Sequence, residues 1–289
     1  MLFDGLQDFL EGHGFAGVVD MRRSAEVLYA GAHGLASPRW GVANTLATRF
    51  DTASITKLFT AVAVLQLVGQ GRLALDDSIH DHTNLAGTTI PRDVTLRHLL
   101  THTSGIADLA EEDLDEAYAE IFRAHPCHVF ETVADFLPLF AGKPPHCPPG
   151  EVRRYCNAGY LLAGLAVEGA AGIGYQEYVE AEVFVPAGMS CSGFFDKRYA
   201  IEDLAEGFDP DDAGRLEQNI YAYPPRGAAD GGAFCTSGAA PIRTGRACGR
   251  AAARRTHRTL PRSAGRDRRR VPPGLRAGVR RRLVVEGGV

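Results

Sequence analysis

The sequence lacks several features that mark membrane proteins, zinc-binding proteins and secreted proteins. It contains no run of about 18 consecutive apolar residues, so no membrane-spanning helix is expected. None of its six cysteines falls in a C-x-x-C pair, so we expect no zinc cluster. The first residues, MLFDGLQDFLEGHG, carry acidic side chains and lack a basic start followed by an apolar core. We therefore expect no secretory signal peptide and, by default, a cytoplasmic protein.

Lysine is rare, with three in 289 residues, and residues 239–289 contain no lysine and no aromatic residue. Fifteen of the 31 basic residues but only two of the 35 acidic residues lie in residues 243–289. That segment therefore carries a formal charge of about +13, against about −17 for everything before it. Such an abrupt change marks a boundary. We predict one folded domain over residues 1–238 and an Arg/Gly/Pro/Ala-rich tail over residues 239–289 that is either disordered or read in a shifted frame.

Hydrophobic patterning predicts both strands and helices in the first part. Two short apolar runs, Phe15–Met21 and Glu26–Ala30, flank a polar turn and predict a hairpin. Residues 52–68, TASITKLFTAVAVLQLV, are apolar nearly all round from Leu58, which predicts a buried helix. Further helices are predicted from an N-cap at Thr95 to Thr101, from a possible cap at Asn157 to Val167 with a stop at Ala170–Gly172, and from Tyr175 to Val185.

Two other segments are expected to serve no chemistry. The acidic stretch Glu111–Glu120 is predicted to be a solvated helix or loop, because a run of charged residues usually lies on a solvent-exposed surface. The small residues of Gly227–Gly238 predict a loop.

The residues Ser54-Ile55-Thr56-Lys57 form an S-x-x-K pattern at the start of the predicted buried helix. Three residues apart on a helix, the two side chains lie on the same face. A serine hydroxyl becomes a good nucleophile only when a base takes its proton, and a neutral lysine can do so. Burial and the positive end of a helix both favour the neutral form. The alternative is a capping serine beside a surface lysine, but a lysine within so apolar a helix is costly to bury without a purpose.

Three phrases in order carry a resemblance to a known family. The segment around Ser54, FDTASITKLFTAVAVLQLVGQGRLALDDSI, resembles the nucleophile segment of class C β-lactamases, penicillin-binding D,D-peptidases and related esterases. VTLRHLLTHTSGI at Val94–Ile106 is similar to a segment typical of that group. PPGEVRRYCNAGYLLAGLAVE is similar to its Y-x-N segment, with Cys156 where serine is usual. The resemblance covers about residues 14–238.

The resemblance implies a serine hydrolase that forms an acyl-enzyme on Ser54. It implies that Lys57 takes the Ser54 proton and that Tyr155, as tyrosinate or as a relay with Lys57, passes a proton to the leaving group and later helps activate water. Asn157 would orient the substrate amide or Lys57, and the Ser54 backbone N–H would supply half of an oxyanion hole. No cofactor and no metal are implied. The implied fold is α+β: an antiparallel sheet flanked by helices, plus a mostly helical domain inserted between the first strands and the last.

Several neighbouring features are not assigned to catalysis. His102 and Ser104 in THTSG resemble a structural turn of the family, and no G-x-S-x-G elbow supports a triad through His102. Gly231-Gly232 resembles a structural segment that precedes a later helix of the family. Tyr155 has the alternative of being a packing residue near a helix start.

The family also needs a K-T-G or H-x-G motif on a strand beside the nucleophile. The similar string Arg243-Thr244-Gly245 follows Gly238 too closely to leave room for the intervening helix, so we interpret it as coincidence. The C-terminal strands of the family are likewise missing, which leaves an open sheet edge. We hypothesise that the reading frame changes just after Gly238 and that the chain is poorly stable and either weakly active or inactive. A translation of the DNA in the other two frames tests this: one frame should encode a strand carrying the motif.

Two other readings stay open. The chain could be a non-catalytic relative that binds a peptide or acyl ligand. The Arg-rich tail could bind nucleic acid through charge, although no aromatic residues are interleaved and no nucleic-acid partner is expected. The partner expected from the resemblance is a small-molecule or peptide substrate; whether it carries a β-lactam, peptide or ester bond, and the oligomeric state, cannot be read from the sequence.

Overall fold

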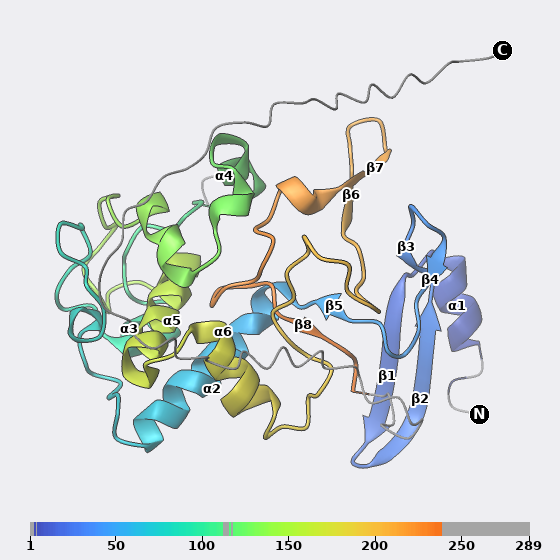
Figure 1. The fold of residues 1–289 in the computed structure, drawn as a ribbon, viewed down its shortest axis with the longest axis horizontal. Helices are drawn as coiled ribbons and strands as arrows, with labels where there is room; N and C mark the ends of the chain where they lie inside the picture. The colour runs from blue at the N-terminus through green and yellow to red at the C-terminus, as the bar shows by residue number, and fades with distance from the viewer. Residues whose placement is uncertain (1–2, 4, 112–115, 117, 239–289) are drawn as a thin grey trace, which may run out of the picture. The chain divides into compact units, whose positions relative to one another are not determined.

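The computed structural model describes residues 3, 5–111, 116 and 118–238, and the structural statements below concern these residues (Figure 1). Residues 239–289, and with them the Arg243-Thr244-Gly245 string, lie outside them, so the predicted domain boundary stays a prediction. The α-helices of the described part are α1 (Leu6–Gly12), α2 (Thr56–Gly69), α3 (Leu96–Leu100), α4 (Tyr118–Ala124), α5 (Asn157–Ala171) and α6 (Tyr175–Tyr178). Short 3-10 turns lie at Ala53–Ile55, Ile79–Asp81, Cys127–Val129, Val133–Leu139 and Asn219–Tyr221, and a π-helical turn, Val179–Phe184, continues α6.

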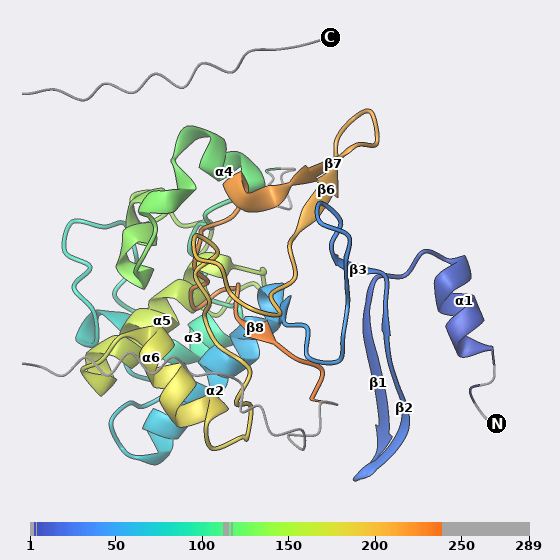
Figure 2. The ribbon, with the colours of Figure 1, turned by 45° about the vertical axis from the view of Figure 1, so that its right-hand side comes forward.

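The described strands pair two by two, and each pair is antiparallel. The predicted hairpin is confirmed: its strands pair from Gly17 opposite His33 to Arg23 opposite Glu26, with Ser24 in a left-handed turn conformation. In Figures 1 and 2 this hairpin lies to one side of helices α2 to α6, with α1 on its far side. The pairs are β1 (Gly17–Arg23) with β2 (Glu26–His33), β3 (Leu35–Ser37) with β4 (Val42–Ala43), β5 (Phe50–Asp51) with β8 (Phe234–Cys235), and β6 (Phe208–Pro210) with β7 (Leu216–Gln218).

Strand β8 corrects one prediction. It lies inside Gly227–Gly238, which the sequence indicated to be a loop, and it pairs with β5, where Phe50 lies opposite Cys235. A strand of two residues has too little pattern to be recognised, and its partner lies far away in the chain. This pairing brings the segment before Ser54 beside the segment after Asp230.

Helix α5 forms the centre of the helical region. It packs against α2 and α3, and Leu161, Leu162 and Val167 are completely buried (Figure 1). Gly172 ends the helix in a left-handed conformation with φ 72°, at the predicted stop. The predicted cap needs correction: Cys156 occupies the N-cap position, and Asn157 is the first helical residue.

Helix α2 is buried on one face only, which corrects the expectation of burial all round. Lys57, Val64 and Leu67 face the core, and Leu67 has 0% exposure. Apolar residues on the opposite face, including Leu58 at 64% and Leu65 at 51%, are exposed. A helix that is apolar all round is usually covered on every side, but here the second face is exposed over the described residues.

The helix predicted after Thr95 is confirmed. Thr95 caps α3, since its side chain accepts a hydrogen bond from the His98 N–H, while His98 Nδ1 accepts one from the Thr95 N–H. Over the described residues, no helix combines the length and the apolar character that crossing a bilayer requires. Antiparallel strands together with a mostly helical region confirm the predicted α+β class.

Candidate active site

The predicted nucleophile Ser54 stands where strand β5 turns into helix α2. Ala53 adopts a left-handed conformation with φ 43°, and its N–H donates to the Asp51 carboxylate at 2.7 Å. The Thr52 N–H donates to the Ala233 carbonyl at 2.8 Å, which holds the turn against the segment entering β8. A non-glycine residue at positive φ costs on the order of 1–3 kcal/mol and persists only where its surroundings fix it. This sharp turn leaves Ser54 exposed at the start of the helix.

Lys57 lies one helical turn beyond Ser54 and is buried. Its Nζ donates to Ser54 Oγ at 3.1 Å, to Asn157 Oδ1 at 2.8 Å and to the Asp230 carbonyl at 2.5 Å. These three oxygen atoms come from three separate segments of the chain. The alternative of a surface lysine is therefore wrong.

Tyr155 also contacts the predicted nucleophile. Its hydroxyl donates to Ser54 Oγ at 2.7 Å, and the Lys57 Nζ lies 5.0 Å from the centroid of its ring. Tyr155 as a residue is 44% exposed, so it is not buried in the core. The structure therefore brings together all four residues that the sequence singled out: Ser54, Lys57, Tyr155 and Asn157.

The ring of His102 packs against the ring of Tyr155. The two rings stack with centroids 4.6 Å apart, and His102 Nδ1 accepts a hydrogen bond from the Cys156 N–H at 3.1 Å. Burial, together with the positive charges of Lys57 and Arg153, lowers the pKa of His102, which favours the neutral ring that this bond requires. His102 thus contacts the tyrosine beside Ser54, and its Nδ1 accepts a hydrogen bond from the backbone of the Y-x-N segment.

Asp108 fixes the beginning of helix α5. Its buried carboxylate accepts hydrogen bonds from the Asn157 N–H at 2.8 Å, the Asn157 side-chain amide at 3.2 Å and the Ala158 N–H at 2.7 Å. It therefore supplies from a distance the cap that Asn157 was expected to provide. Burial raises the pKa of Asp108, although these N–H groups oppose the rise. The Asn157 Oδ1 is left free to face Lys57.

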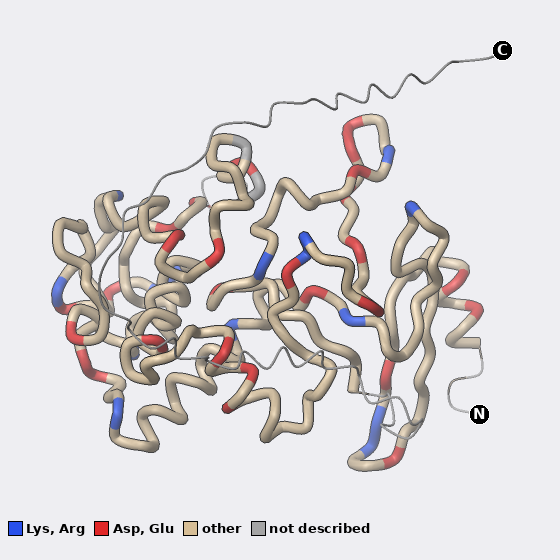
Figure 3. The backbone as a smooth tube through the Cα atoms, viewed as in Figure 1, with Lys and Arg blue, Asp and Glu red and all other residues tan. Residues whose placement is uncertain are grey.

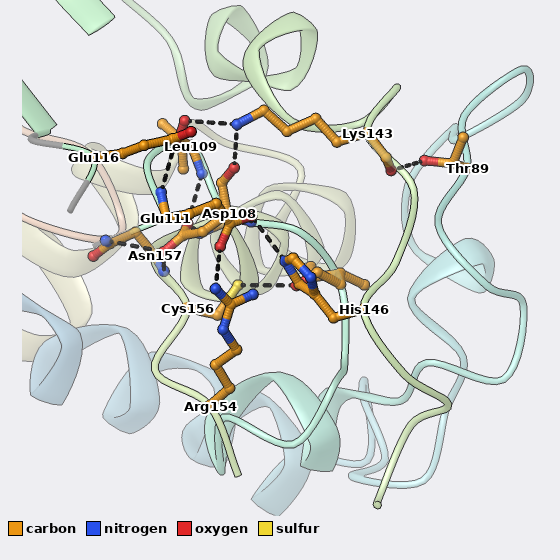
Figure 4. Close-up of polar contacts among 12 residues, drawn as sticks. Thr89, Asp108, Leu109, Glu111, Glu116, Lys143, His146, Arg154, Cys156 and Asn157 are labelled. Carbon is orange, nitrogen blue, oxygen red and sulfur yellow. Dashed lines mark hydrogen bonds and ion pairs between the residues drawn. The ribbon is translucent and has the colours of Figure 1, made fainter. Parts of the chain in front are cut away.

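A second carboxylate, that of Glu111, accepts a hydrogen bond from the Asp108 backbone N–H. Figure 4 shows the Glu111 side chain close to His146 and Arg154, which it contacts at 2.9 and 2.7 Å. Burial acts to raise the pKa of Glu111, but the hydrogen bonds from His146 and the Asp108 N–H and the charge of Arg154 hold it below the ordinary value. Glu111 was expected to be solvated. The structure corrects this, because the carboxylate is buried and ion-paired rather than exposed.

The Gly227–Gly232 loop carries the third acceptor of Lys57. A Cβ on Gly227 would lie 2.2 Å from the Gly232 carbonyl oxygen, so only glycine allows the loop to close this tightly. The side chain of Asp230 is buried and accepts a hydrogen bond from Tyr118 at 3.3 Å. Burial raises the pKa of Asp230 to about 6, against the opposing effect of the Lys57 charge.

A cavity of about 390 Å³ opens beside Ser54. Its wall includes Ser54, Asn157 and Asp230, together with aromatic side chains of Tyr118, Phe136, Tyr223 and Phe234. Two cationic side chains, Lys197 and Arg226, also line it. Over the described chain, no group of three or more His, Cys, Asp and Glu side chains is arranged to hold a metal ion.

The sequence did not single out Asp108, Asp230 or Lys197. Asp108 lies two residues after the HTSGI phrase, and Asp230 lies in the Gly-rich segment. The family-like segments next to them were recognisable in the sequence, but the two residues themselves were not. Asp108 contacts Asn157, which lies 49 positions away, and Asp230 contacts Lys57, which lies 173 positions away. Such distant pairings have no local pattern in the sequence.

The chain is similar to several known proteins. The chain is 32% identical over 215 residues to penicillin-binding protein 4 of Amycolatopsis lactamdurans, covering 71% of this chain and 52% of that protein. It is 34% identical over 193 residues to esterase EstB of Burkholderia gladioli, covering 64% and 49%. This chain thus spans about half the length of these curated relatives. A solved penicillin-binding protein of Bacillus halodurans superposes with a TM-score of 0.76 and 37% identity, over 80% of this chain and 70% of that one.

The sequence profile of the family described as Beta-lactamase matches residues 4–283, further than the range of about 14–238 over which the motifs were readable. With a match over nearly its whole length, the chain belongs to the beta-lactamase family.

Proposed function

We propose that this chain is a serine hydrolase that cleaves an amide, β-lactam or ester bond through an acyl-enzyme on Ser54. One observation carries the proposal: Ser54 Oγ lies within hydrogen-bond distance of both the Lys57 Nζ and the Tyr155 hydroxyl. Two proton-exchanging groups on one exposed serine match what nucleophilic catalysis requires. The relatives named above, a penicillin-binding protein and an esterase, support this reaction class.

The contacts of Lys57 suit a base. In its neutral form the amine keeps two N–H groups, which it donates to Asn157 Oδ1 and the Asp230 carbonyl. In that form its lone pair is left for the third neighbour, Ser54 Oγ at 3.1 Å, from which it would accept the hydroxyl proton. As that proton moves to Nζ, the Ser54 oxygen attacks the substrate carbonyl carbon.

Tyr155 completes the proton path. Its hydroxyl lies 2.7 Å from Ser54 Oγ, and the residue is partly exposed to solvent. When the tetrahedral intermediate collapses, Tyr155 gives a proton to the leaving amine or alcohol and regains one from Lys57. In the second half of the reaction the same pair removes a proton from the water that attacks the acyl-enzyme.

The developing oxyanion needs two donors. The Ser54 N–H supplies one, and in the family pattern the second comes from a strand with a K-T-G or H-x-G motif, which residues 239–289 do not offer in readable form. Loss of one such donor lowers the rate by roughly 100- to 1,000-fold. We therefore propose that this chain turns over its substrate slowly.

The test uses a p-nitrophenyl ester and a chromogenic β-lactam with the purified chain and its Ser54→Ala variant. We expect slow turnover that disappears in the variant. Rapid turnover would contradict the proposed loss of an oxyanion donor. Turnover that persists at the same rate in Ser54→Ala would contradict the hydrolase mechanism itself and favour a relative that only binds acyl ligands.

A further inference from the structure

The three lysines of this chain differ in what their ammonium groups contact. Lys57 donates to three oxygen atoms, and Lys143 donates to the backbone carbonyls of Asp108 and Leu109, both at 2.9 Å. The Nζ of Lys197 has no hydrogen-bond or ion-pair acceptor within the described residues. Yet Lys197 lines the same cavity as Ser54. Figure 3 shows acidic positions spread over the described chain and basic ones scattered among them, so a cation inside a cavity is not part of a general basic surface.

The position of Lys197 in the cavity wall is fixed by its backbone. Its N–H donates to the Pro225 carbonyl at 2.8 Å, which ties it to the segment that carries Tyr223 and Arg226. The Nζ lies 5.9 Å from the centroid of the Tyr223 ring, so the aromatic face partly stabilises the charge. The ammonium group is thus held in the wall of the cavity, and no group of residues 5–111 or 118–238 accepts a hydrogen bond from it.

The other charged groups around the cavity each make at least one hydrogen bond. One carboxylate oxygen of Asp51 accepts the Ala53 N–H, and the Asp230 carboxylate accepts the Tyr118 hydroxyl. The Nε of Arg226 donates to the Phe194 carbonyl at 3.1 Å. Burial lowers the pKa of Lys197, while the negative charge of Asp51 acts in the opposite direction. Asp51 therefore influences Lys197 through its charge but forms no direct bond with it.

We propose that Lys197 binds a carboxylate of the substrate whose carbonyl carbon Ser54 attacks. An ammonium group has three donors, and in a half-buried cavity an anionic oxygen is the partner that compensates its lost hydration. The aromatic wall of Tyr118, Phe136 and Tyr223 suits the apolar chain between the two functional groups. The inference rests on the proposed function, because it places the carbonyl at Ser54. It narrows the substrate class to acyl compounds with a negatively charged end.

Two esters of equal chain length test this preference. Mono-4-nitrophenyl adipate and 4-nitrophenyl hexanoate differ in the carboxylate at the far end of the acyl chain. After the spontaneous rates are subtracted, we expect a kcat/KM about 10- to 100-fold higher for the adipate, the range for a hydrogen bond to a charged group. The Lys197→Gln variant should lose that ratio, and Lys197→Arg should keep most of it. If the wild-type chain does not prefer the adipate, the inference is wrong, even if Lys197→Gln fails to fold.

Arg198→Gln is the matched control. Arg198 is the next residue and carries the same charge, but it is exposed, pairs with Asp196 and Glu131, and does not line the cavity. Its removal changes the net charge by the same amount, so the adipate preference should stay as in wild type. If Arg198→Gln lowers the ratio as much as Lys197→Gln does, the preference reflects the overall field of the protein and the subsite assignment is wrong.

A binding experiment separates this inference from the proposed function. With Ser54→Ala, adipamic acid should bind at least about 10-fold more tightly than hexanamide by isothermal titration calorimetry, and Lys197→Gln should abolish the difference. If the chain hydrolyses neither ester but shows this difference, the anion subsite stands and the proposed hydrolysis fails. If both esters are hydrolysed through Ser54 at equal efficiency and both amides bind equally, the hydrolase stands and the subsite is wrong.

Discussion

The carboxylate of Asp108 accepts hydrogen bonds from both the backbone N–H and the side-chain amide of Asn157. This double contact fixes the side chain whose Oδ1 binds Lys57, so a residue with no contact to Ser54 determines where the predicted base lies. The Lys143 ammonium holds the Asp108 carbonyl in turn (Figure 4).

Replacing Asp108 with Asn tests this relationship. The amide in the variant has one acceptor oxygen instead of two and presents an NH2 group to the N–H donors of α5. We expect the free energy of unfolding to fall by about 1–3 kcal/mol and turnover to fall with it. Urea denaturation followed by circular dichroism measures the change. Asp8→Asn, on the exposed face of α1, is the control and should change stability by less than about 0.5 kcal/mol.

Tyr155→Phe removes only the hydroxyl that donates to Ser54 Oγ. If Tyr155 exchanges protons in the reaction, kcat should fall by about 100- to 10,000-fold. The stability should barely change because the residue is 44% exposed and the stacking of its ring on His102 is kept. Ester hydrolysis and thermal unfolding, measured on the same preparation, check both statements. A variant with near-normal kcat would show that the phenol is only a packing group.

Asp230 predicts a pH dependence of stability. Its pKa is raised from the ordinary 3.8 to about 6, so between these values the folded chain binds more protons than the unfolded chain. The stability that this group contributes is therefore present at low pH and lost as the pH rises through about 6. In the Asp230→Asn variant the side chain does not titrate, so this pH-dependent contribution to the free energy of unfolding is absent. Urea unfolding at pH 4.5 to 7.5 should show the wild-type stability falling relative to that of the variant; parallel curves would contradict the assignment.

The two faces of α2 predict opposite outcomes for the same substitution. Leu67 is completely buried, and Leu67→Ala should lower the free energy of unfolding by about 2–5 kcal/mol. Leu65 lies two residues away at 51% exposure, and Leu65→Ala should change it by less than about 0.5 kcal/mol. Chemical denaturation of both variants gives the comparison. Equal losses would mean that a further segment or molecule covers the Leu65 face in solution.

The sequence predicted the local features of this fold well. The β1–β2 hairpin, the Thr95 cap and the spacing of Ser54 and Lys57 each depend on residues within a few positions of one another. Tyr155 could be placed beside them only through the family resemblance, since it lies 101 residues from Ser54. The burial of Glu111 was missed because its partners His146 and Arg154 come from a distant loop. A charge run looks solvated until tertiary structure supplies the opposite charges.

Covalent labelling at position 54 tests the central claim most directly. The purified chain is incubated with a fluorophosphonate and, separately, with penicillin, and the adduct is located by peptide mass spectrometry, with Ser54→Ala and Lys57→Met as comparisons. The account predicts a single adduct on Ser54, much slower labelling of Lys57→Met, and none in Ser54→Ala. An unlabelled Ser54 in folded protein, or an adduct that forms equally well without Lys57, would contradict it.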